Sequence, residues 1–207
     1  MTQVLIVEDQ RMARERMEDY IQALPGYRLA GSITNAAMAE MVCMHSPVDL
    51  ILMDVCTDRD ESGLEAAARI KKHFPGIRII IVTSMPEYSF LQKAKAAGAE
   101  SFWYKDVGRQ TLTDVIRRTM QGESVYPDKP PRLQIGQASS YEFTEKELEV
   151  LRLLVDGLSY SEMARELNVS VSAIKYHVNN MLQKTGYTSK TKLAVAVVNK
   201  KLIISGF

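Results

Sequence analysis

The sequence has few cysteines and no long apolar run, and each shortage excludes a class of protein. Cys43 and Cys56 are its only cysteines, and neither lies in a set of residues spaced like metal ligands. A disulfide-stapled fold is therefore excluded, and we expect free thiols in a reducing compartment. No apolar stretch approaches the roughly 20 residues of a membrane span. Residues 1–3 lead directly into a predicted strand, without the layout of a signal peptide, so we expect a cytoplasmic protein with no membrane partner.

Acidic residues are missing from the last part of the chain. Residues 1–142 carry 17 Lys and Arg against 19 Asp and Glu, and residues 143–207 carry 9 against 6, which gives net charges of −2 and +3. No acid follows Glu166, whereas six lysines do: Lys175, Lys184, Lys190, Lys192, Lys200 and Lys201. Such a block fits a polyanionic partner such as nucleic acid, or simply a solubilising surface. Charge alone leaves both readings open.

The first 122 residues alternate between strand and helix patterns. Short apolar runs at 3–8, 28–33, 48–54, 77–82 and 100–104 predict strands. Helical spacing of apolar residues follows in 13–24, 64–74, 87–98 and 112–122, and Pro-Gly or Gly closes each segment. Strand–helix repeats of this kind predict an α/β domain with a doubly wound, parallel (βα)5 sheet.

The rest of the chain predicts a linker and a small all-α domain. Residues 123–142 contain Pro127, Pro130, Pro131 and Gly136 and have neither period, which is typical of a linker. From residue 143 on only helical patterns occur, at about 144–157, 159–167, 171–186 and 189–200. The second and third are joined by a short turn, which predicts a helix-turn-helix unit in a domain of residues 143–207.

In the first of these helices Thr144 is the predicted N-cap. We expect Leu148, Leu151 and Val155 to form its core face. In the last helix we expect Leu193, Ala194 and Val197 to point inward, with Val198 or Ile203 left exposed.

Several predicted strands end on residues that can hold or transfer a phosphoryl group. The strand at 48–54 ends at Asp54, and the strand at 3–8 ends at Glu8 and Asp9. Because the carboxyl ends of parallel strands meet at one edge of a sheet, three carboxylates would gather there, and Mg²⁺ would offset their repulsion. Thr83 and Lys105 follow the fourth and fifth strands. This set predicts a phosphoryl site with Asp54 as the nucleophile.

These positions resemble the receiver domain of two-component response regulators. The C-terminal sequences FTEKELEVL at 143–151, MA at 163–164 and VSAIKYHV at 171–178 resemble a LuxR-type helix-turn-helix. The chain as a whole is similar to response regulators of the NarL/FixJ class. The resemblance implies that Asp9, Asp54 and the backbone carbonyl of Cys56 hold Mg²⁺, with Glu8 acting through its water ligands.

The resemblance also implies roles in phosphorylation. Asp54 would take the phosphoryl group from a cognate histidine kinase, and Thr83 and Lys105 would bind its oxygens. Phe102 would be the aromatic residue that changes rotamer. The further implied partners are double-stranded promoter DNA, a second copy of the chain when active, and RNA polymerase as an additional candidate.

The loop after Asp54 departs from the family pattern. The family usually has Met-Pro there and reaches a glycine eight residues after the acceptor, whereas this loop lacks proline and Gly63 is nine residues on. The loop also contains three acids: Asp58, Asp60 and Glu61. We expect it to lie over the site and to alter metal affinity, kinase choice and phosphoryl lifetime. Thr57 and Arg59 are candidates to reach the phosphoryl group.

The helix at 171–185 is the predicted DNA reader. Its apolar face uses positions 174, 178, 181 and 182, and its opposite face carries Ser172, Lys175, Tyr176 and Asn179. Lysine reads guanine and asparagine reads adenine in the major groove, so Lys175, Tyr176 and Asn179 are predicted to contact base edges. The predicted phosphate contacts are Lys184, Lys190 and Lys192. The last helix either pairs two subunits or only completes the domain core.

Two other functions would also use parts of this sequence. Acids at strand ends also build Mg²⁺ phosphatases of the haloacid dehalogenase type, but those need a second acid two residues after the nucleophile, where this chain has Cys56. The other alternative is a constitutive DNA-binding regulator whose receiver serves only protein contacts. The prediction is a transcriptional regulator, not an enzyme, in which phosphorylation of Asp54 exposes the DNA-reading helix and promotes dimerisation.

Overall fold

The computed structural model of the protein describes residues 1–105 and 111–204, without the side chain of Asp60. The chain forms two compact units. The first comprises Met1–Ser84 and Ser89–Pro130, and the second comprises Met85–Tyr88 and the residues from Pro131 on. None of the helices built by these described residues combines the length and the apolarity needed to cross a membrane.

The first unit is built on a five-stranded sheet in which every pair of neighbours is parallel. The strand order is β2-β1-β3-β6-β7, where the bounds are β1 (Thr2–Val7), β2 (Tyr27–Ile33), β3 (Leu50–Asp54), β6 (Arg78–Thr83) and β7 (Ser101–Tyr104). The doubly wound parallel sheet predicted from the sequence is confirmed. The order reverses at β1 and β3, and ligands bind beyond the strand ends at such a switch point.

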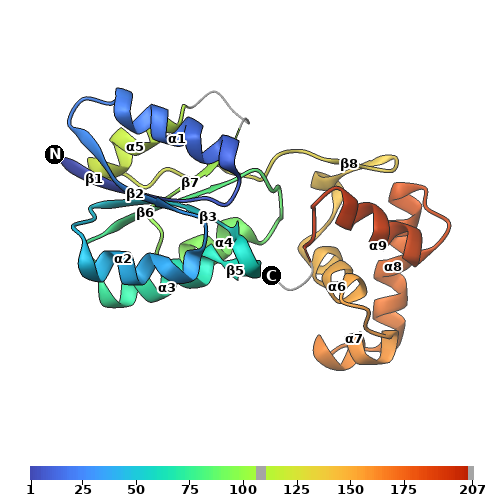
Figure 1. Ribbon diagram of the computed structural model, residues 1–207. Helices are drawn as coiled ribbons and strands as arrows, with labels where there is room; N and C mark the ends of the chain where they lie inside the picture. The colour runs from blue at the N-terminus through green and yellow to red at the C-terminus, as the bar shows by residue number, and fades with distance from the viewer. Residues whose placement is uncertain (106–110, 205–207) are drawn as a thin grey trace. The chain divides into compact units, whose positions relative to one another are not determined.

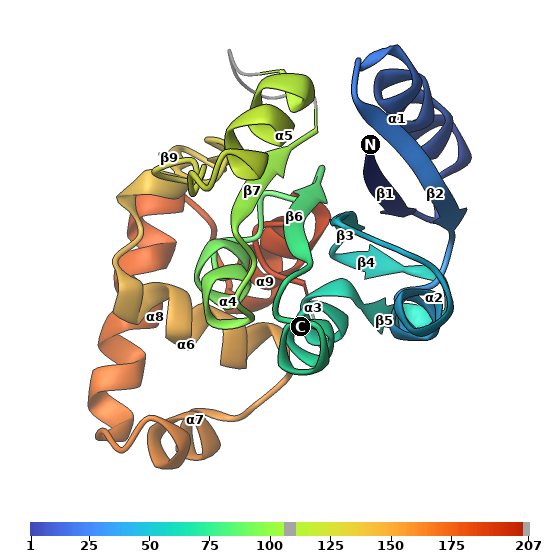
Figure 2. The same ribbon diagram turned by 90° about the vertical axis from the view of Figure 1, so that its left-hand side faces the viewer.

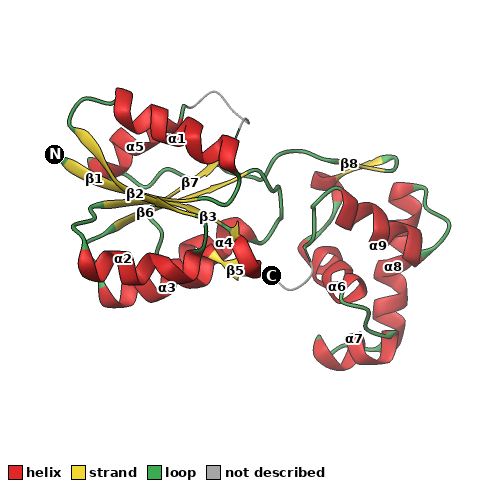
Figure 3. Cartoon of the chain, viewed as in Figure 1, coloured by secondary structure: helices red, strands yellow, loops and turns green. Residues whose placement is uncertain are grey.

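Helices cover both faces of this sheet. Helices α1 (Arg11–Ala23) and α5 (Leu112–Met120) lie on one face, and α2 (Ala39–His45), α3 (Gly63–His73) and α4 (Phe90–Ala96) lie on the other (Figures 1 and 3). All five residues of β3 are buried, as its uninterrupted apolar run predicts for a strand covered on both sides. The sequence patterns predicted α1, α3 and α5 closely, placed the start of α4 too early, and did not predict α2.

The segment after β3 is a small antiparallel hairpin. Strand β4 (Cys56–Thr57) pairs with β5 (Glu61–Ser62), and the turn η2 (Asp58–Asp60) joins them. The hairpin follows directly on β3, as Figure 2 shows. Nearby, the connection from β2 to α2 contains the short helix η1 (Ala36–Met38).

The second unit contains four helices and a short hairpin among its described residues. The helices are α6 (Glu145–Val155), α7 (Tyr160–Glu166), α8 (Val171–Thr185) and α9 (Lys190–Asn199). The hairpin consists of β8 (Gln134–Ile135) and β9 (Ala138–Ser139), followed by the turn η3 (Ser140–Glu142). It lies within residues 123–142, the predicted linker. The side chains of Thr144, Ser159, Ser170 and Ser189 each accept a hydrogen bond from the first turn of the helix that follows, so hydroxyl caps set where all four helices begin.

The core face of α6 differs from the prediction by about one position. Its buried residues are Glu147, Val150, Leu151 and Leu154, whereas Leu148 and Val155 are only partly buried. The reason is Glu147: its carboxylate is held inside by the cap hydrogen bond from Thr144 N and by the ammonium group of Lys184. In α9, Leu193 and Val197 are buried as expected, and Ala194 is partly buried against the same core. Val198 is exposed, whereas Ile203, which follows the helix, is fully buried.

A segment from the middle of the sequence belongs to this second unit. Glu87, which has no exposed surface, forms an ion pair with Arg152 of α6. Its carboxylate also accepts a hydrogen bond of 2.7 Å from the backbone N–H of Ile204. The neighbouring Tyr88 packs against the hydrophobic core of this unit. The core of the second unit is therefore completed by residues that directly follow β6.

Candidate functional site

Three carboxylates meet at the carboxyl edge of the sheet. Glu8 and Asp9 follow β1, Asp54 ends β3, and the two strands are neighbours in the sheet. One oxygen from each carboxylate lies within 4.8 Å of the others. Glu8 is fully buried and Asp54 is 5% exposed. The structure thus brings together the three acids that the sequence predicted at this edge.

Lys105, directly after β7, supplies the opposing charge. Its Nζ lies 2.9 Å from Oδ2 of Asp54 and also forms an ion pair with Glu8. The other oxygen of Asp54 accepts a hydrogen bond of 2.7 Å from the backbone N–H of Val55. Both Asp54 oxygens therefore have donors, and one lysine joins two of the three acids.

The electrostatics of this cluster follow from its burial. The pKa of Asp54 is raised to about 7: burial is the largest cause and the charge of Glu8 adds to it, while Lys105 and the hydrogen bond from Val55 act in the opposite direction. Burial alone would lower the pKa of Lys105, but the carboxylates of Asp54 and Glu8 outweigh it, so that pKa is raised. Lys105 remains a cation, and a further positive charge would favour the ionised form of Asp54.

The donor set fits a hard divalent cation. Oδ1 of Asp9 is buried and has no hydrogen-bond partner among the described residues, so it is available as a metal ligand. Mg²⁺ is bound by one or two carboxylates together with water and phosphate oxygens, which is what Asp9 and Asp54 offer. Cys56, whose carbonyl is the third predicted ligand, begins β4 two residues after Asp54.

Sequence reasoning missed one residue that fixes the acidic turn. Nη1 of Arg14 in α1 donates to the carbonyl oxygens of Glu8 at 2.8 Å and Asp9 at 3.2 Å. The backbone N–H of Gln10 donates to Oε1 of Glu8 at 3.2 Å. The sequence does place an arginine near the start of the helix that follows the acids. A single arginine does not indicate which groups it will bind, so this contact was not predicted.

The remaining predicted residues of this site lie on β6, β7 and the hairpin. Thr83 is buried at the end of β6, and its carbonyl accepts a 2.8 Å hydrogen bond from the N–H of Lys105. Phe102 is buried, with its ring centroid 4.8 Å from that of Tyr104. Thr57, a candidate to reach a phosphoryl group, is instead held by backbone groups of Ala36 and Glu61.

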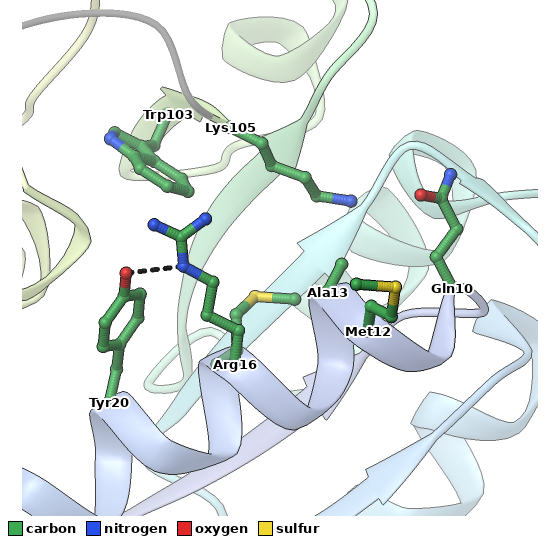
Figure 4. Close-up of a pocket in the computed structure, with 8 residues that line it drawn as sticks. Gln10, Met12, Ala13, Arg16, Tyr20, Trp103 and Lys105 are labelled. Carbon is green, nitrogen blue, oxygen red and sulfur yellow. Dashed lines mark hydrogen bonds between the residues drawn. The ribbon is translucent and has the colours of Figure 1, made fainter.

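A pocket of about 270 Å³ lies beside the acidic cluster, between α1 and β7 (Figure 4). Trp103 and Lys105 line it from β7 and the residue after it, and α1 contributes Arg16 and Tyr20, which are joined by a hydrogen bond of 2.7 Å. Trp103 is the only tryptophan of the chain. Its place in the same pocket as Lys105 makes it an intrinsic fluorescent reporter for this site.

The second predicted site is the polar face of α8. Ile174, Val178 and Met181 are buried in the core of the second unit. The predicted DNA contacts Ser172, Lys175, Tyr176 and Asn179 are all exposed. Tyr176 is 63% exposed, an unusual state for a large aromatic side chain. One face of α8 is thus polar and lies outside the core of the second unit.

The three predicted phosphate contacts have different environments. Lys192 is exposed, and Nζ of Lys190 lies 4.5 Å from the ring centroid of Tyr160. Lys184 binds groups of its own unit: its Nζ lies 2.7 Å from the buried carboxylate of Glu147 and donates a hydrogen bond of 2.9 Å to the carbonyl of Glu142. The structure therefore gives Lys184 a role inside the second unit.

Two family models match the chain. Residues 4–117 match the response regulator receiver domain, and residues 142–197 match the bacterial regulatory proteins of the luxR family. The response regulator protein VraR of Staphylococcus aureus strain NCTC 8325 is 31% identical over 205 residues, which cover 97% of this chain and 98% of that protein. VraR of Staphylococcus epidermidis is also 31% identical with the same coverage.

Solved structures show the same fold. RcsB from Salmonella enterica serovar Typhimurium, bound to promoter rprA in the presence of the phosphomimetic BeF3⁻, has a TM-score of 0.63 with 20% identity. The similarity covers 95% of this chain and 98% of that one. A LuxR-family response regulator from Aurantimonas sp. SI85-9A1 is 25% identical with a TM-score of 0.56, over 60% of this chain and 89% of the other.

Proposed function

This chain belongs to the two-component response regulators with a LuxR-type DNA-binding domain, and we propose that phosphorylation of Asp54 by a histidine kinase controls its binding to promoter DNA. Residues 1–122 would act as the receiver, 123–142 as the linker and 143–207 as the DNA-binding domain. One arrangement carries the proposal: Asp54 lies buried beside Lys105 and two further carboxylates, in a chain whose helix α8 has a polar face outside the core of its own unit.

The reaction is a phosphoryl transfer to a carboxylate. An oxygen of Asp54 forms a bond to phosphorus as the bond between phosphorus and the histidine nitrogen of the kinase breaks, and the imidazole leaves with the electron pair. Asp9, Asp54 and the carbonyl of Cys56 would hold Mg²⁺, with Glu8 acting through its waters. The ion would neutralise charge on the phosphoryl oxygens. Lys105 already lies 2.9 Å from the nucleophile, where it can bind an oxygen of the incoming group.

The response to phosphorylation follows from the new charge. A phosphoryl group on Asp54 adds a dianion that attracts the Thr83 hydroxyl and the Lys105 ammonium. Movement of Thr83 vacates space that the ring of Phe102, one strand away, would fill by changing rotamer. We infer that this change exposes the DNA-reading helix and promotes a homodimer.

On DNA, α8 would enter the major groove. Lys175, Tyr176 and Asn179 would contact base edges, Ser172 would support them, and Lys190 and Lys192 would contact phosphates. Lys184 is the third proposed phosphate contact, and its ion pair with Glu147 also gives it a structural role. RNA polymerase is the further partner proposed for a regulator at a promoter.

The main alternative is a constitutive DNA-binding regulator. The experiment that separates the two measures DNA affinity and oligomeric state with and without Mg²⁺ and acetyl phosphate, for wild type and Asp54→Asn. Asp54→Asn keeps the shape of the side chain and removes the nucleophile. We expect only wild type to dimerise and to gain affinity. Equal DNA affinity and oligomeric state in all four conditions would refute control by phosphorylation and favour the constitutive regulator.

A further inference from the structure

The hairpin that follows the acceptor is held by the connection between β2 and α2. Its sequence, residues 55–62, has no proline and is one residue longer than the family pattern. Arg59, in its turn, adopts a left-handed conformation with φ of 64°. A loop of this kind can adopt many backbone conformations, so contacts with residues outside the loop must stabilise the observed one.

Three hydrogen bonds provide those contacts, and a fourth joins the two strands of the hairpin. The hydroxyl of Thr57 accepts from the N–H of Ala36 at 3.0 Å and donates to the carbonyl of Glu61 at 2.9 Å. The N–H of Asp58 donates to the carbonyl of Thr34 at 3.1 Å. The side-chain amide of Asn35 donates to the carbonyl of Asp58 at 2.9 Å. We call these four bonds the hairpin clasp.

Thr57 is the centre of the clasp. It is 4% exposed, and its hydroxyl joins the two strands of the hairpin to the N-terminus of η1. Valine has the same shape and cannot make either bond, so a valine at this position would remove the hydroxyl from both the N–H of Ala36 and the carbonyl of Glu61. Serine would keep both bonds.

The clasp acts next to the proposed metal site. The peptide unit between Cys56 and Thr57 contains the carbonyl that would complete the Mg²⁺ ligands with Asp9 and Asp54. At the other end of the loop, the N–H of Gly63 donates to the carbonyl of Val55 at 2.8 Å. The Cys56 carbonyl thus lies between two anchored residues: Val55, anchored by its backbone bond to Gly63, and Thr57, anchored by its side chain.

We propose that Thr57 is a positioning residue that fixes the Cys56 carbonyl for Mg²⁺ and replaces the rigidity that a proline gives this loop elsewhere in the family. The inference rests on the proposed function, because that function assigns the carbonyl to the metal. Loss of a residue that orients a metal ligand typically costs roughly 10–100-fold in metal affinity. We expect Thr57→Val to weaken Mg²⁺ binding by about tenfold, at the lower end of that range, because only one ligand is affected.

The test is a titration of the full chain with Mg²⁺, followed by the fluorescence of Trp103 or by isothermal calorimetry. Thr57→Ser should bind within about twofold of wild type, and Thr191→Val, an exposed threonine of α9, serves as the matched control. Asn35→Ala removes the one clasp bond made by a side chain other than Thr57, from a partly exposed position, and it should weaken binding in the same direction. It keeps the test decisive if Thr57→Val does not fold.

A second readout separates positioning from general stability. Phosphorylation of Thr57→Val by acetyl phosphate should need more Mg²⁺ but reach the wild-type rate at saturation, since the nucleophile is untouched. A lower plateau rate, or Mg²⁺ affinity equal to wild type in both Thr57→Val and Asn35→Ala, would overturn the inference alone. If wild type itself binds no Mg²⁺, the proposed function fails together with it.

Discussion

Gly63→Ala tests how closely the start of α3 approaches the acceptor. A Cβ at Gly63 would lie 1.8 Å from the carbonyl oxygen of Asp54 and 2.9 Å from its carbonyl carbon. Real Cβ contacts essentially never fall below 3.0 Å, so the oxygen would have to move by at least 1.2 Å, the difference between the two distances. The atom in the way belongs to the backbone of a central strand and cannot rotate aside. The strain therefore falls directly on the residue that carries the nucleophile.

The expected cost follows from these distances. Overpacking of a tight interior costs about 1–3 kcal/mol, and a backbone clash of this depth belongs at the upper end. A loss of about 3 kcal/mol corresponds to a melting temperature lower by roughly 10 °C in a unit of this size. A displacement of about 1 Å at the nucleophile can slow its reaction on the order of 100-fold.

The assay compares Gly63→Ala with Gly76→Ala in the full chain. A Cβ at Gly76 would meet nothing within 4 Å, so that variant controls for the change from glycine to alanine. Thermal unfolding and the rate of phosphorylation by acetyl phosphate with Mg²⁺ are measured for both. If the two variants have the same melting temperature and the same rate, the close approach of α3 to Asp54 is wrong.

Three further predictions concern charge. Burial alone would raise the pKa of Glu147, but its hydrogen bonds with Lys184 outweigh burial, so that pKa is lowered from 4.5. Glu147→Gln should therefore lower the free energy of unfolding by about 2 kcal/mol at pH 7. That loss should shrink as the pH falls through the lowered pKa, and a difference in melting temperature independent of pH would contradict it. Because burial raises the pKa of Asp54 to about 7, the ionised form is unfavourable in the Mg²⁺-free fold. Wild type should therefore lose stability relative to Asp54→Asn as the pH rises from about 4 to about 7, and calorimetry showing no such loss would refute this. Lys175→Ala should cost about 1–3 kcal/mol of binding free energy on the specific DNA site only, whereas Lys192→Ala should weaken binding to all DNA sequences equally and lower the slope of log K against log salt concentration by about one. If fluorescence anisotropy shows the same loss on specific and random DNA for both variants, Lys175 does not read bases.

The sheet and its acidic edge were predictable because they depend on local patterns. A strand buried on both faces must be apolar throughout, and this pattern identified β3 in the sequence. Because β1 and β3 are parallel neighbours, their carboxyl ends lie together. The sequence therefore indicated that Glu8, Asp9 and Asp54 would meet. It did not indicate which of the acids Lys105 would bind, since that depends on side-chain packing.

Helix α2 was not predictable from periodicity. Met38, which directly precedes the helix, and Met41 and Met44 within it recur at helical spacing, yet they are 45%, 47% and 61% exposed. Only Ala39 and Cys43 are buried from this helix, so the apolar stripe and the core face do not coincide. A seven-residue helix with two small buried residues leaves no clear signal.

The hairpin clasp and the core face of α6 depend on contacts between distant residues. Thr57 meets Ala36 across 21 residues of sequence, and Lys184 meets Glu147 across 37. A glutamate at a helix N-terminus is normally read as a solvated cap, so its burial follows only from the lysine that the fold brings to it. Contacts between residues so far apart in sequence leave no trace in the local spacing of apolar and polar residues, so they could not be predicted from it.

The placement of Met85–Tyr88 in the second unit has a consequence for how the protein is made and dissected. The chain passes between the units three times, after Ser84, after Tyr88 and after Pro130. During synthesis Glu87 emerges long before Arg152, so their ion pair can form only after α6 has been made. A recombinant fragment that starts at residue 131 would deprive Arg152 of its buried carboxylate. Such a fragment should therefore be less stable than the same unit in the intact chain.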